Sequence, residues 1–315
     1  NVLIEAQGAQ SDLTLLANVS ATGGSISLLS AGGVVQGEGV EVASGGGTID
    51  VEATGGSVAM AAAARLASDG GASRIAAATD VMLGVVDAGD GGPQSGWGSV
   101  SVIATNGSIL ETTDASATTT HILASGVRLS AGNAVGGFDV REYVFEFSSD
   151  GITWTTLASV LSADGVVQFT TPDPGTTRAF FRVILPDANA TAVFVAPGFA
   201  ADGNLLLTLN RSYVGSFGGL NTLEIEALTL SASAGVGGVN LSDVNTVTVG
   251  AVGVESNRVG KNAQTAAIMD DIQSGVRTSD FGSTVVRALS GDLTIDQTVG
   301  SVGGILLSAE GEDSD

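Results

Sequence analysis

The sequence predicts an all-β protein in which a parallel β-helix, a solenoid with coils of about 25 residues, is interrupted by a small antiparallel β-sandwich. Short pairs of apolar residues recur at nearly constant intervals, Gly-rich turns separate these pairs, and almost every aromatic residue falls within one window of the chain. The first two observations predict the coils, and the third predicts the insert and its boundaries.

The apolar pairs set the period of the predicted solenoid. Along two tracks, the first members of successive pairs recur about every 25 residues. Such short strands at this period predict one coil each, with coils about 4.8 Å apart and ladders of apolar side chains inside. The first track is Ile26/Leu28, Ile49/Val51, Ile75, Val100/Val102 and Val127/Leu129, and the second is Val34, Val58, Val81 and Ile109.

Glycine-rich turns lie between the pairs and interrupt any helical pattern. Examples are Gly45-Gly46-Gly47, Asp69-Gly70-Gly71 and Thr105-Asn106-Gly107-Ser108. The alanine-rich segment 60–64 is flanked by such turns, so we expect a strand and a corner there rather than a helical turn. A β-sandwich or barrel, with a turn about every 10 residues, would explain the strands but not their longer recurrence.

The aromatic residues mark the insert. All of them except Trp97 and Phe281 lie in residues 138–217, together with four of the five prolines. Residues 141–147 alternate strictly between polar and apolar before a turn at 148–151, and further strands are predicted at 166–169, 179–185 and 192–195. Five or six antiparallel strands with aromatic side chains predict a small sandwich with its own core.

The coil rhythm resumes after the insert. Leu223/Ile225 are followed by Val247/Val249, and Leu228 by Val252, Val276 and Val302, so the earlier period returns. The predicted domains are therefore coils in residues 1–137, the sandwich in 138–217, and coils that continue the rod in 218–315. Because the chain opens on Asn1 within an apolar run, we expect it to be a piece of a longer mature protein.

Composition narrows the possible partners. The chain is 43% hydrophobic and 14% charged, and 33 acidic against 11 basic residues give a formal charge of −22. Nucleic acid is an improbable partner because phosphate binding needs clustered Lys and Arg. No apolar run is long enough to predict a membrane-spanning segment. Without cysteine there is neither a disulfide framework nor a thiolate metal site.

Several segments resemble the filamentous-haemagglutinin-like repeat adhesins of bacteria, across about 235 residues of the coils. These segments are residues 24–28 (Gly-Ser-Ile-Ser-Leu), 98–109, 275–288 and 290–295 (Ser-Gly-Asp-Leu-Thr-Ile). The resemblance implies a right-handed parallel β-helix, secretion, and a place at the cell surface. The chain departs from that pattern in lacking an Arg-Gly-Asp triplet. In the insert, the stretch from Tyr143 to Trp154 is similar to strands of fibronectin-type and carbohydrate-binding sandwiches.

Two aspartates are the candidate metal ligands. The run Asp87-Ala-Gly-Asp90-Gly-Gly is similar to part of the Gly- and Asp-rich calcium repeats, and Ca²⁺ favours carboxylate and backbone oxygens. We predict a possible Ca²⁺ site at Asp87 and Asp90. The alternative is a plain exposed turn, since the repeat itself does not recur.

Catalytic residues are hard to find, and we expect no enzyme. The single histidine, His121, is expected to face water or a turn, because it follows three threonines. A polysaccharide-active β-helix enzyme is the remaining alternative, with Asp87 and Asp90, or Asp270 and Asp271 near Arg277, as its acidic groups.

The sequence therefore predicts an extracellular structural or adhesive rod at a bacterial surface. Its expected partners are neighbouring coils or further copies, with assembly into a filament or surface layer. The second hypothesis is a glycan-binding module in which Trp154 stacks on sugars, although the alternation favours Trp154 in the core of the sandwich.

Overall fold

The computed structural model describes residues 1–112, 119–137, 141–162, 166–174, 179–184, 192–200, 204–210, 222–279 and 282–311. The chain divides into two compact units, Asn1–Gly137 with Gly218–Asp315, and Phe138–Phe217. Among the described residues the one helical element is a 3-10 turn, Gln94–Gly96. The predicted all-β class is confirmed. None of the described helices is long and apolar enough to cross a membrane.

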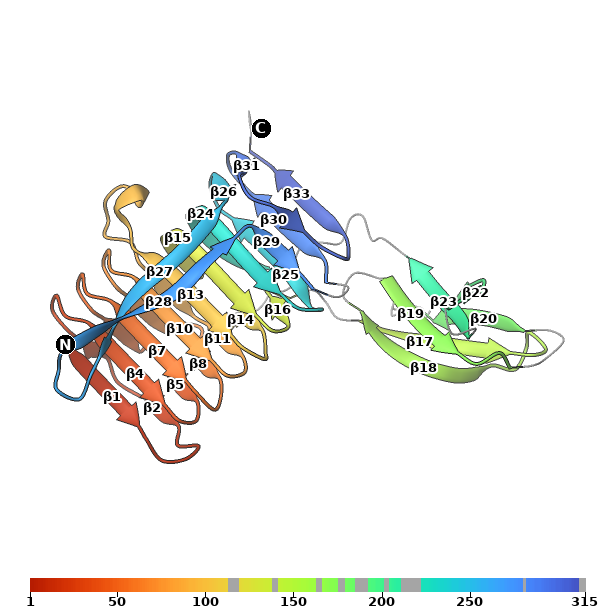
Figure 1. Ribbon diagram of the computed structural model, residues 1–315, viewed down its shortest axis with the longest axis horizontal. Coiled ribbons are helices and arrows are strands. Elements are labelled where there is room, and N and C mark those ends of the chain that lie inside the picture. Colours follow the sequence, from red (N-terminus) through yellow and green to blue (C-terminus); the bar gives the residue numbers. More distant parts are fainter. Residues whose placement is uncertain are drawn as a thin grey trace. The chain divides into compact units, whose positions relative to one another are not determined.

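The first unit is a stack of coils with three faces, which we name A, B and C (Figure 1). Face A contains β1 (Val2–Ala6), β4 (Ile26–Ser30), β7 (Ile49–Ala53), β10 (Ser73–Ala77), β13 (Ser99–Ala104) and the second half of β15 (Ile122–Ala131). Face B contains β2 (Leu13–Leu15), β5 (Val34–Gln36), β8 (Val58–Met60), β11 (Val81–Leu83), β14 (Ile109–Glu111) and β16 (Ala134–Val135). Face C contains β3 (Val19–Ser20), β6 (Glu41–Ala43), β9 (Arg65–Ala67), β12 (Val85–Asp87) and the first half of β15.

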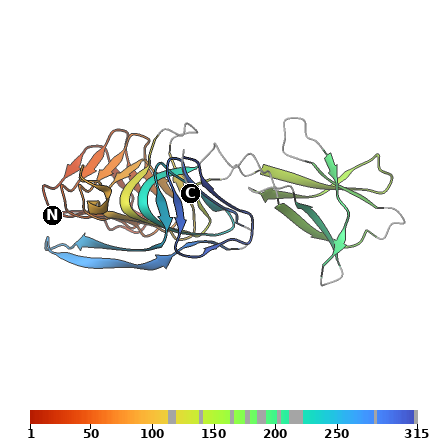
Figure 2. The same ribbon diagram turned by 90° about the horizontal axis from the view of Figure 1, so that it is seen from above.

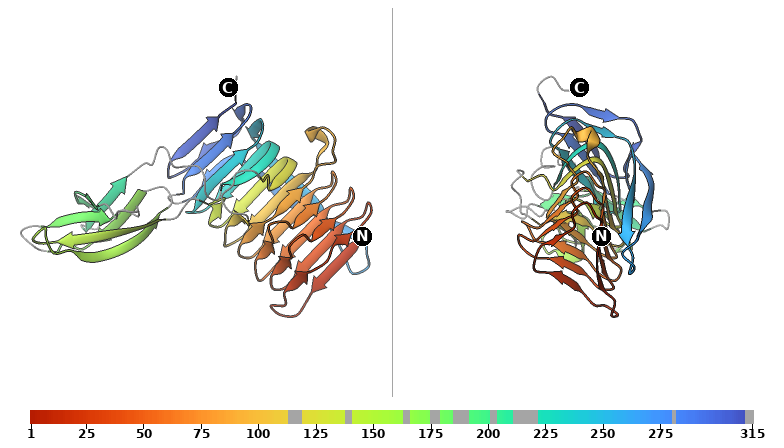
Figure 3. Two further views of the ribbon diagram at one scale, coloured as in Figure 1. Left: turned by 180° about the vertical axis from the view of Figure 1, so that it is seen from behind. Right: turned by 90° about the vertical axis from the view of Figure 1, so that its left-hand side faces the viewer.

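Neighbouring strands on each face are parallel and stack in chain order (Figure 3). On face B, Val34 pairs with Val58, Val58 with Val81, and Val81 with Ile109, as the second track predicts. The parallel β-helix is thus confirmed. The alanine-rich segment also ends strand β8 and forms the corner before β9, as expected.

The first track is correct except in one coil. Ser73, rather than Ile75, pairs with Ile49 and Val100. Ile75 pairs instead with Val51 and Val102, so it belongs to the second row of the same face. The buried hydroxyl of Ser73 takes an apolar position, which is why the apolar pattern alone assigns this coil to the wrong row.

Coils resume after the insert with a different register from the predicted one. The strands are β24 (Leu223–Ala234), β25 (Gly238–Asp243), β26 (Val247–Val249), β29 (Val276–Thr278), β30 (Thr284–Ala288), β31 (Leu293–Ile295), β32 (Val299–Gly300) and β33 (Ile305–Ala309). Leu223 pairs with Leu241, and Val249 pairs with Leu230, so the predicted match of Leu223/Ile225 with Val247/Val249 is wrong. Strands β24 and β25 each continue from one face to the next, and this shortens the local repeat.

Residues 251–274 form an antiparallel hairpin rather than a coil. Its strands β27 (Ala251–Val259) and β28 (Thr265–Ser274) lie lengthwise along the outside of face A (Figure 2). The predicted ladder through Val252 is therefore wrong, because Val252 belongs to β27 and pairs with Gln273. Hydrogen bonds join the hairpin to the coils, among them Asn257 N to Thr48 Oγ1 at 2.9 Å.

The second unit contains two antiparallel sheets. One has the order β18 (Thr155–Ser162), β17 (Arg141–Ser148), β20 (Phe180–Ile184), β21 (Ala192–Phe194), and the other has β19 (Val166–Thr171), β23 (Leu205–Asn210), β22 (Gly198–Phe199). Phe145, Phe181 and Val183 from the first sheet and Leu207 from the second form a common buried core. The antiparallel β-sandwich insert is thereby confirmed, although residue 185 of one predicted strand lies outside the described residues.

Candidate functional site

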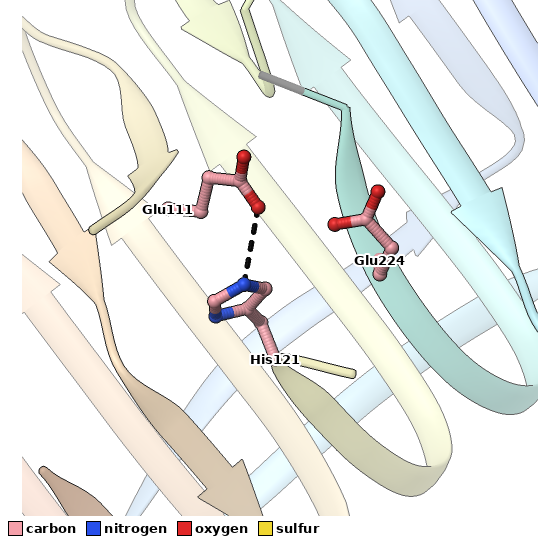
Figure 4. Close-up of side chains that lie close together, drawn as sticks. All are labelled: Glu111, His121 and Glu224. Carbon is pink, nitrogen blue, oxygen red and sulfur yellow. Dashed lines mark ion pairs between the residues drawn. The ribbon is translucent and has the colours of Figure 1, made fainter. Parts of the chain in front are cut away.

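Two glutamates and the single histidine lie together in the first unit. Glu111 ends β14, His121 immediately precedes β15, and Glu224 is the second residue of β24. Their ligand atoms, a ring nitrogen and two carboxylate oxygens, all lie within 4.8 Å of one another. Figure 4 shows the imidazole ring and both carboxylates turned towards a common point. This is the one group of three potential metal ligands found among the described residues.

The stacking of coils explains why these side chains meet. Glu111 pairs in register with Leu83, a fully buried residue, so its side chain follows an interior row of face B. His121 and Glu224 come from adjacent coils, and the amide of His121 donates to the carbonyl of Glu224 at 2.9 Å. The chain between them includes the whole insert. The cluster therefore forms only where the coil after the insert stacks on the coil before it.

The geometry orients the imidazole ring. Nδ1 of His121 lies 2.7 Å from the carbonyl oxygen of Gly84, and a carbonyl can only accept, so Nδ1 carries a hydrogen. The other nitrogen, Nε2, lies 3.1 Å from Oε2 of Glu111. Both side chains are almost entirely buried, with 1% and 6% of their surface exposed. The expectation that His121 faces water is wrong.

The electrostatics of the cluster favour a positive charge between its members. Burial, followed by the hydrogen bond and the charge of Glu111, raises the pKa of Glu224 to about 7, although His121 opposes the rise. Two carboxylates this close repel each other when both are ionised, so they favour a shared proton or a cation between them. Chemically, the group can therefore share a proton, or it can offer one nitrogen and two carboxylate oxygens to a metal ion.

The predicted calcium ligands are each engaged in other contacts. The Oδ2 atom of Asp87 forms an ion pair with Arg65, and its Oδ1 accepts from Gly89 N at 2.7 Å. Asp90 accepts from Gly92 N at 2.8 Å. Both aspartates thus stabilise their own turns, and Ca²⁺ binding there stays a prediction.

The acidic pair proposed for a carbohydrate-active site lies in the hairpin. Asp270 belongs to β28, and its Oδ1 accepts from Nε of Arg74 on face A at 3.1 Å. The backbone carbonyl of Asp271 accepts from Arg128 at 3.0 Å. These contacts attach the hairpin to the coils, and no described contact joins either aspartate to Arg277.

Trp154 lies on the outer side of the sandwich rather than in its core. Arg182 alternates with the core residues Phe181 and Val183, so its side chain points away from the core. The Arg182 guanidinium lies over the Trp154 ring at 4.0 Å, and Phe194 meets Trp154 edge-on at 5.8 Å. With 68% of Phe194 exposed, these side chains form an aromatic surface, and the preference for a core position of Trp154 is wrong.

Sequence reasoning found His121 but missed its two partners. Glu111 and Glu224 lie on opposite sides of the insert and share no motif. One signal was available, since Glu111 lies on the same side of its strand as Ile109, which belongs to the interior track of face B. A carboxylate in an interior row needs a partner.

No protein-family model, curated protein or solved structure matches this chain.

Proposed function

We propose that the chain is a structural and adhesive rod segment of a large extracellular bacterial surface protein. The observation that supports this proposal is the in-register stack of coils, in which Val34, Val58, Val81 and Ile109 form one uninterrupted interior ladder. Each coil contacts mainly its neighbours, so length and stiffness come from repetition and not from a reactive pocket. The proposal assigns no reaction to the chain.

Assembly into a filament or surface layer is part of the same proposal. Leu307 on β33 is 38% exposed, whereas its in-register partner Val286 on β30 is 1% exposed. Ile305 on the same strand is 49% exposed. A parallel strand from a second copy of the chain, or from a neighbouring coil of a longer parent chain, would cover these side chains and pair with β33.

Electron microscopy and light scattering of the purified full chain test the assembly. We expect elongated multimers that dissociate when both Ile305 and Leu307 are replaced by Lys. Val35→Lys is the matched control, because Val35 is also about half exposed but lies on the outer side of face B away from β33. Compact monomers at all concentrations, or equal dissociation by the control, would overturn self-assembly.

The placement of the chain at the cell surface has its own test. Antibodies raised against the purified chain should label intact source bacteria without permeabilisation, and beads coated with the chain should adhere to surfaces that uncoated beads do not. Labelling that appears only after the cells are opened would contradict an extracellular rod.

Glycan binding by the insert is a second candidate, favoured by the aromatic surface of Trp154, Phe194 and Arg182. Sugars stack on exposed aromatic rings and accept hydrogen bonds from a neighbouring guanidinium. Screening the full chain against immobilised glycans should give binding that Trp154→Ala abolishes. Leu16→Ala, at an exposed site of the first unit, is the control and should bind normally. Binding that survives Trp154→Ala would exclude this surface.

A further inference from the structure

We propose that Glu111, His121 and Glu224 bind one divalent transition-metal ion of the zinc class, which joins the coil before the insert to the coil after it. The proposal does not depend on the adhesive function and concerns a group of residues that this function leaves unexplained.

The ligand set selects the class of metal. Zn²⁺ and related ions bind imidazole nitrogen and carboxylate oxygen, whereas Ca²⁺ and Mg²⁺ favour oxygen alone and higher coordination numbers. His121 contributes nitrogen, and the two glutamates contribute oxygen. Three protein ligands leave one position of a tetrahedron for water.

The histidine is already held as metal-binding histidines usually are. Its Nδ1 donates to the Gly84 carbonyl at 2.7 Å, which fixes the ring and directs Nε2 towards the carboxylates. Hydrogen bonds from the second ring nitrogen to a carbonyl or carboxylate recur around metal ligands and orient them. This contact is independent of the two glutamates, and it also supports a metal site.

The spacing of the ligand atoms suits a small cation after small side-chain shifts. A tetrahedral ion about 2.1 Å from each ligand atom requires ligand separations of about 3.4 Å. Nε2 of His121 and Oε2 of Glu111 are already 3.1 Å apart, and the remaining ligand atoms lie within 4.8 Å. The ligand atoms are therefore close to the separations of a tetrahedral site.

Charge balance favours the ion over separate ionised groups. A divalent cation neutralises two carboxylates beside a neutral imidazole, so the buried cluster carries no net charge.

The position of the cluster gives the ion a structural role. Glu111 and His121 precede the insert and Glu224 follows it, so one ion links strands that the whole insert separates along the chain. Such a link restricts the unfolded chain and fixes the register in which β24 stacks on β15.

Calorimetric titration of the chelator-treated full chain with ZnCl2 tests the site. We expect one equivalent to bind. His121→Gln and Glu224→Gln should weaken binding about 100-fold or more. Glu226→Gln on the same strand is the matched control and should leave binding unchanged. If either ligand variant bound Zn²⁺ as tightly as the native chain does, or if the native chain showed no saturable binding, the proposal would be overturned.

Two further measurements keep the test decisive if a variant does not fold. CoCl2 bound to the native chain should give the intense visible absorption of tetrahedral Co²⁺, and excess CaCl2 should not remove it. Zn²⁺ should also slow exchange of the His121 amide hydrogen, which donates to Glu224 across the two coils, at least tenfold. Octahedral Co²⁺, displacement by Ca²⁺, or unchanged exchange of this amide would each contradict the assigned site.

Discussion

Arg258 of the hairpin donates through Nε to Oδ2 of Asp50 on face A at 2.6 Å, and Asp50 is fully buried beneath it. The same guanidinium contacts Glu52, which also accepts from Arg74. Burial alone would raise the pKa of Glu52, but the hydrogen bonds from both arginines outweigh it and lower that pKa. In a chain with few basic residues, these two arginines neutralise the buried Asp50 and the partly buried Glu52 and attach a hairpin to the coils.

Replacement of Arg258 by Ala should therefore loosen the hairpin. The change leaves Asp50 buried with one cation instead of two, and loss of a hydrogen bond to a buried charged group costs about 2 kcal/mol. Hydrogen exchange of the β27 amides and chemical denaturation of the full chain measure the effect. Lys261→Ala is the control, since the Lys261 amine is exposed and lies 3.8 Å from Glu5, and surface pairs of this kind contribute less than about 1 kcal/mol. Equal effects of the two substitutions would show that the buried network does not hold the hairpin.

The sequence predicted the coils well because the interior rows are apolar and their period is nearly constant. Val58, Val81 and Ile109 stack as expected, and only Ser73 broke the pattern in its row. The hairpin escaped prediction for a physical reason. Val252 and Val254 alternate with small or polar residues. A coil strand with one buried side has the same alternation. The period of the apolar residues cannot distinguish a strand that forms part of a coil from a strand that packs against the outside of the coils.

The cluster of Glu111, His121 and Glu224 could not be predicted from spacing. Its members meet only because the chain leaves the stack for the insert and then returns to the neighbouring position. The neighbours of a side chain next to a long insert depend on the register in which the chain rejoins the coils. The apolar pattern after the insert predicted the wrong register. The threonines before His121 indicated exposure locally, whereas the adjacent coil buries it.

Gly71 should not tolerate a larger residue, because of steric contact with the preceding coil and not because of its turn propensity. A Cβ there would lie 1.9 Å from the backbone oxygen of Gly47 in the preceding coil, and one at Gly98 would lie 2.0 Å from the oxygen of Gly71. Gly71→Ala must push two coils apart and should cost about 2 kcal/mol or more. Thermal unfolding of the full chain measures this, with Gly300→Ala as the control because nothing lies within 4 Å of its added methyl group. A neutral Gly71→Ala would show that the coils can separate at this corner without loss of packing.

Trp154 and Phe145 should differ sharply in what they contribute to the insert. Phe145 is fully buried in the core, so Phe145→Ala should cost about 4 kcal/mol. Trp154→Ala removes an outer contact with Arg182 and Phe194 and should cost about 1 kcal/mol. Hydrogen exchange of the β20 amides reports on both. Collapse of the insert in Trp154→Ala would place this ring back among the core residues and remove the basis for a sugar-binding surface.

Asp243 should make the stability of the coils depend on pH. Its carboxyl group is 1% exposed, and burial raises its pKa to about 7, with a further rise from Glu226, although the amides of Asn245 and Ala227 oppose the shift. The pKa in the folded state thus lies above the ordinary value of 3.8 in the unfolded state. Between these values the folded chain keeps a proton that the unfolded chain has lost, so stability falls as the pH rises.

The comparison of the native chain with Asp243→Asn isolates this effect, because other titrating groups contribute equally to both. From about pH 4 to about pH 7 the unfolding free energy of the native chain should fall relative to that of the variant by about 1.4 kcal/mol per unit. Above pH 7 the difference should stay constant, since both states are then ionised. Urea denaturation at half-unit steps of pH measures the two curves. Parallel curves over the whole range would mean that Asp243 is ionised in the folded coils, and that the amides of Ala227 and Asn245 outweigh its burial.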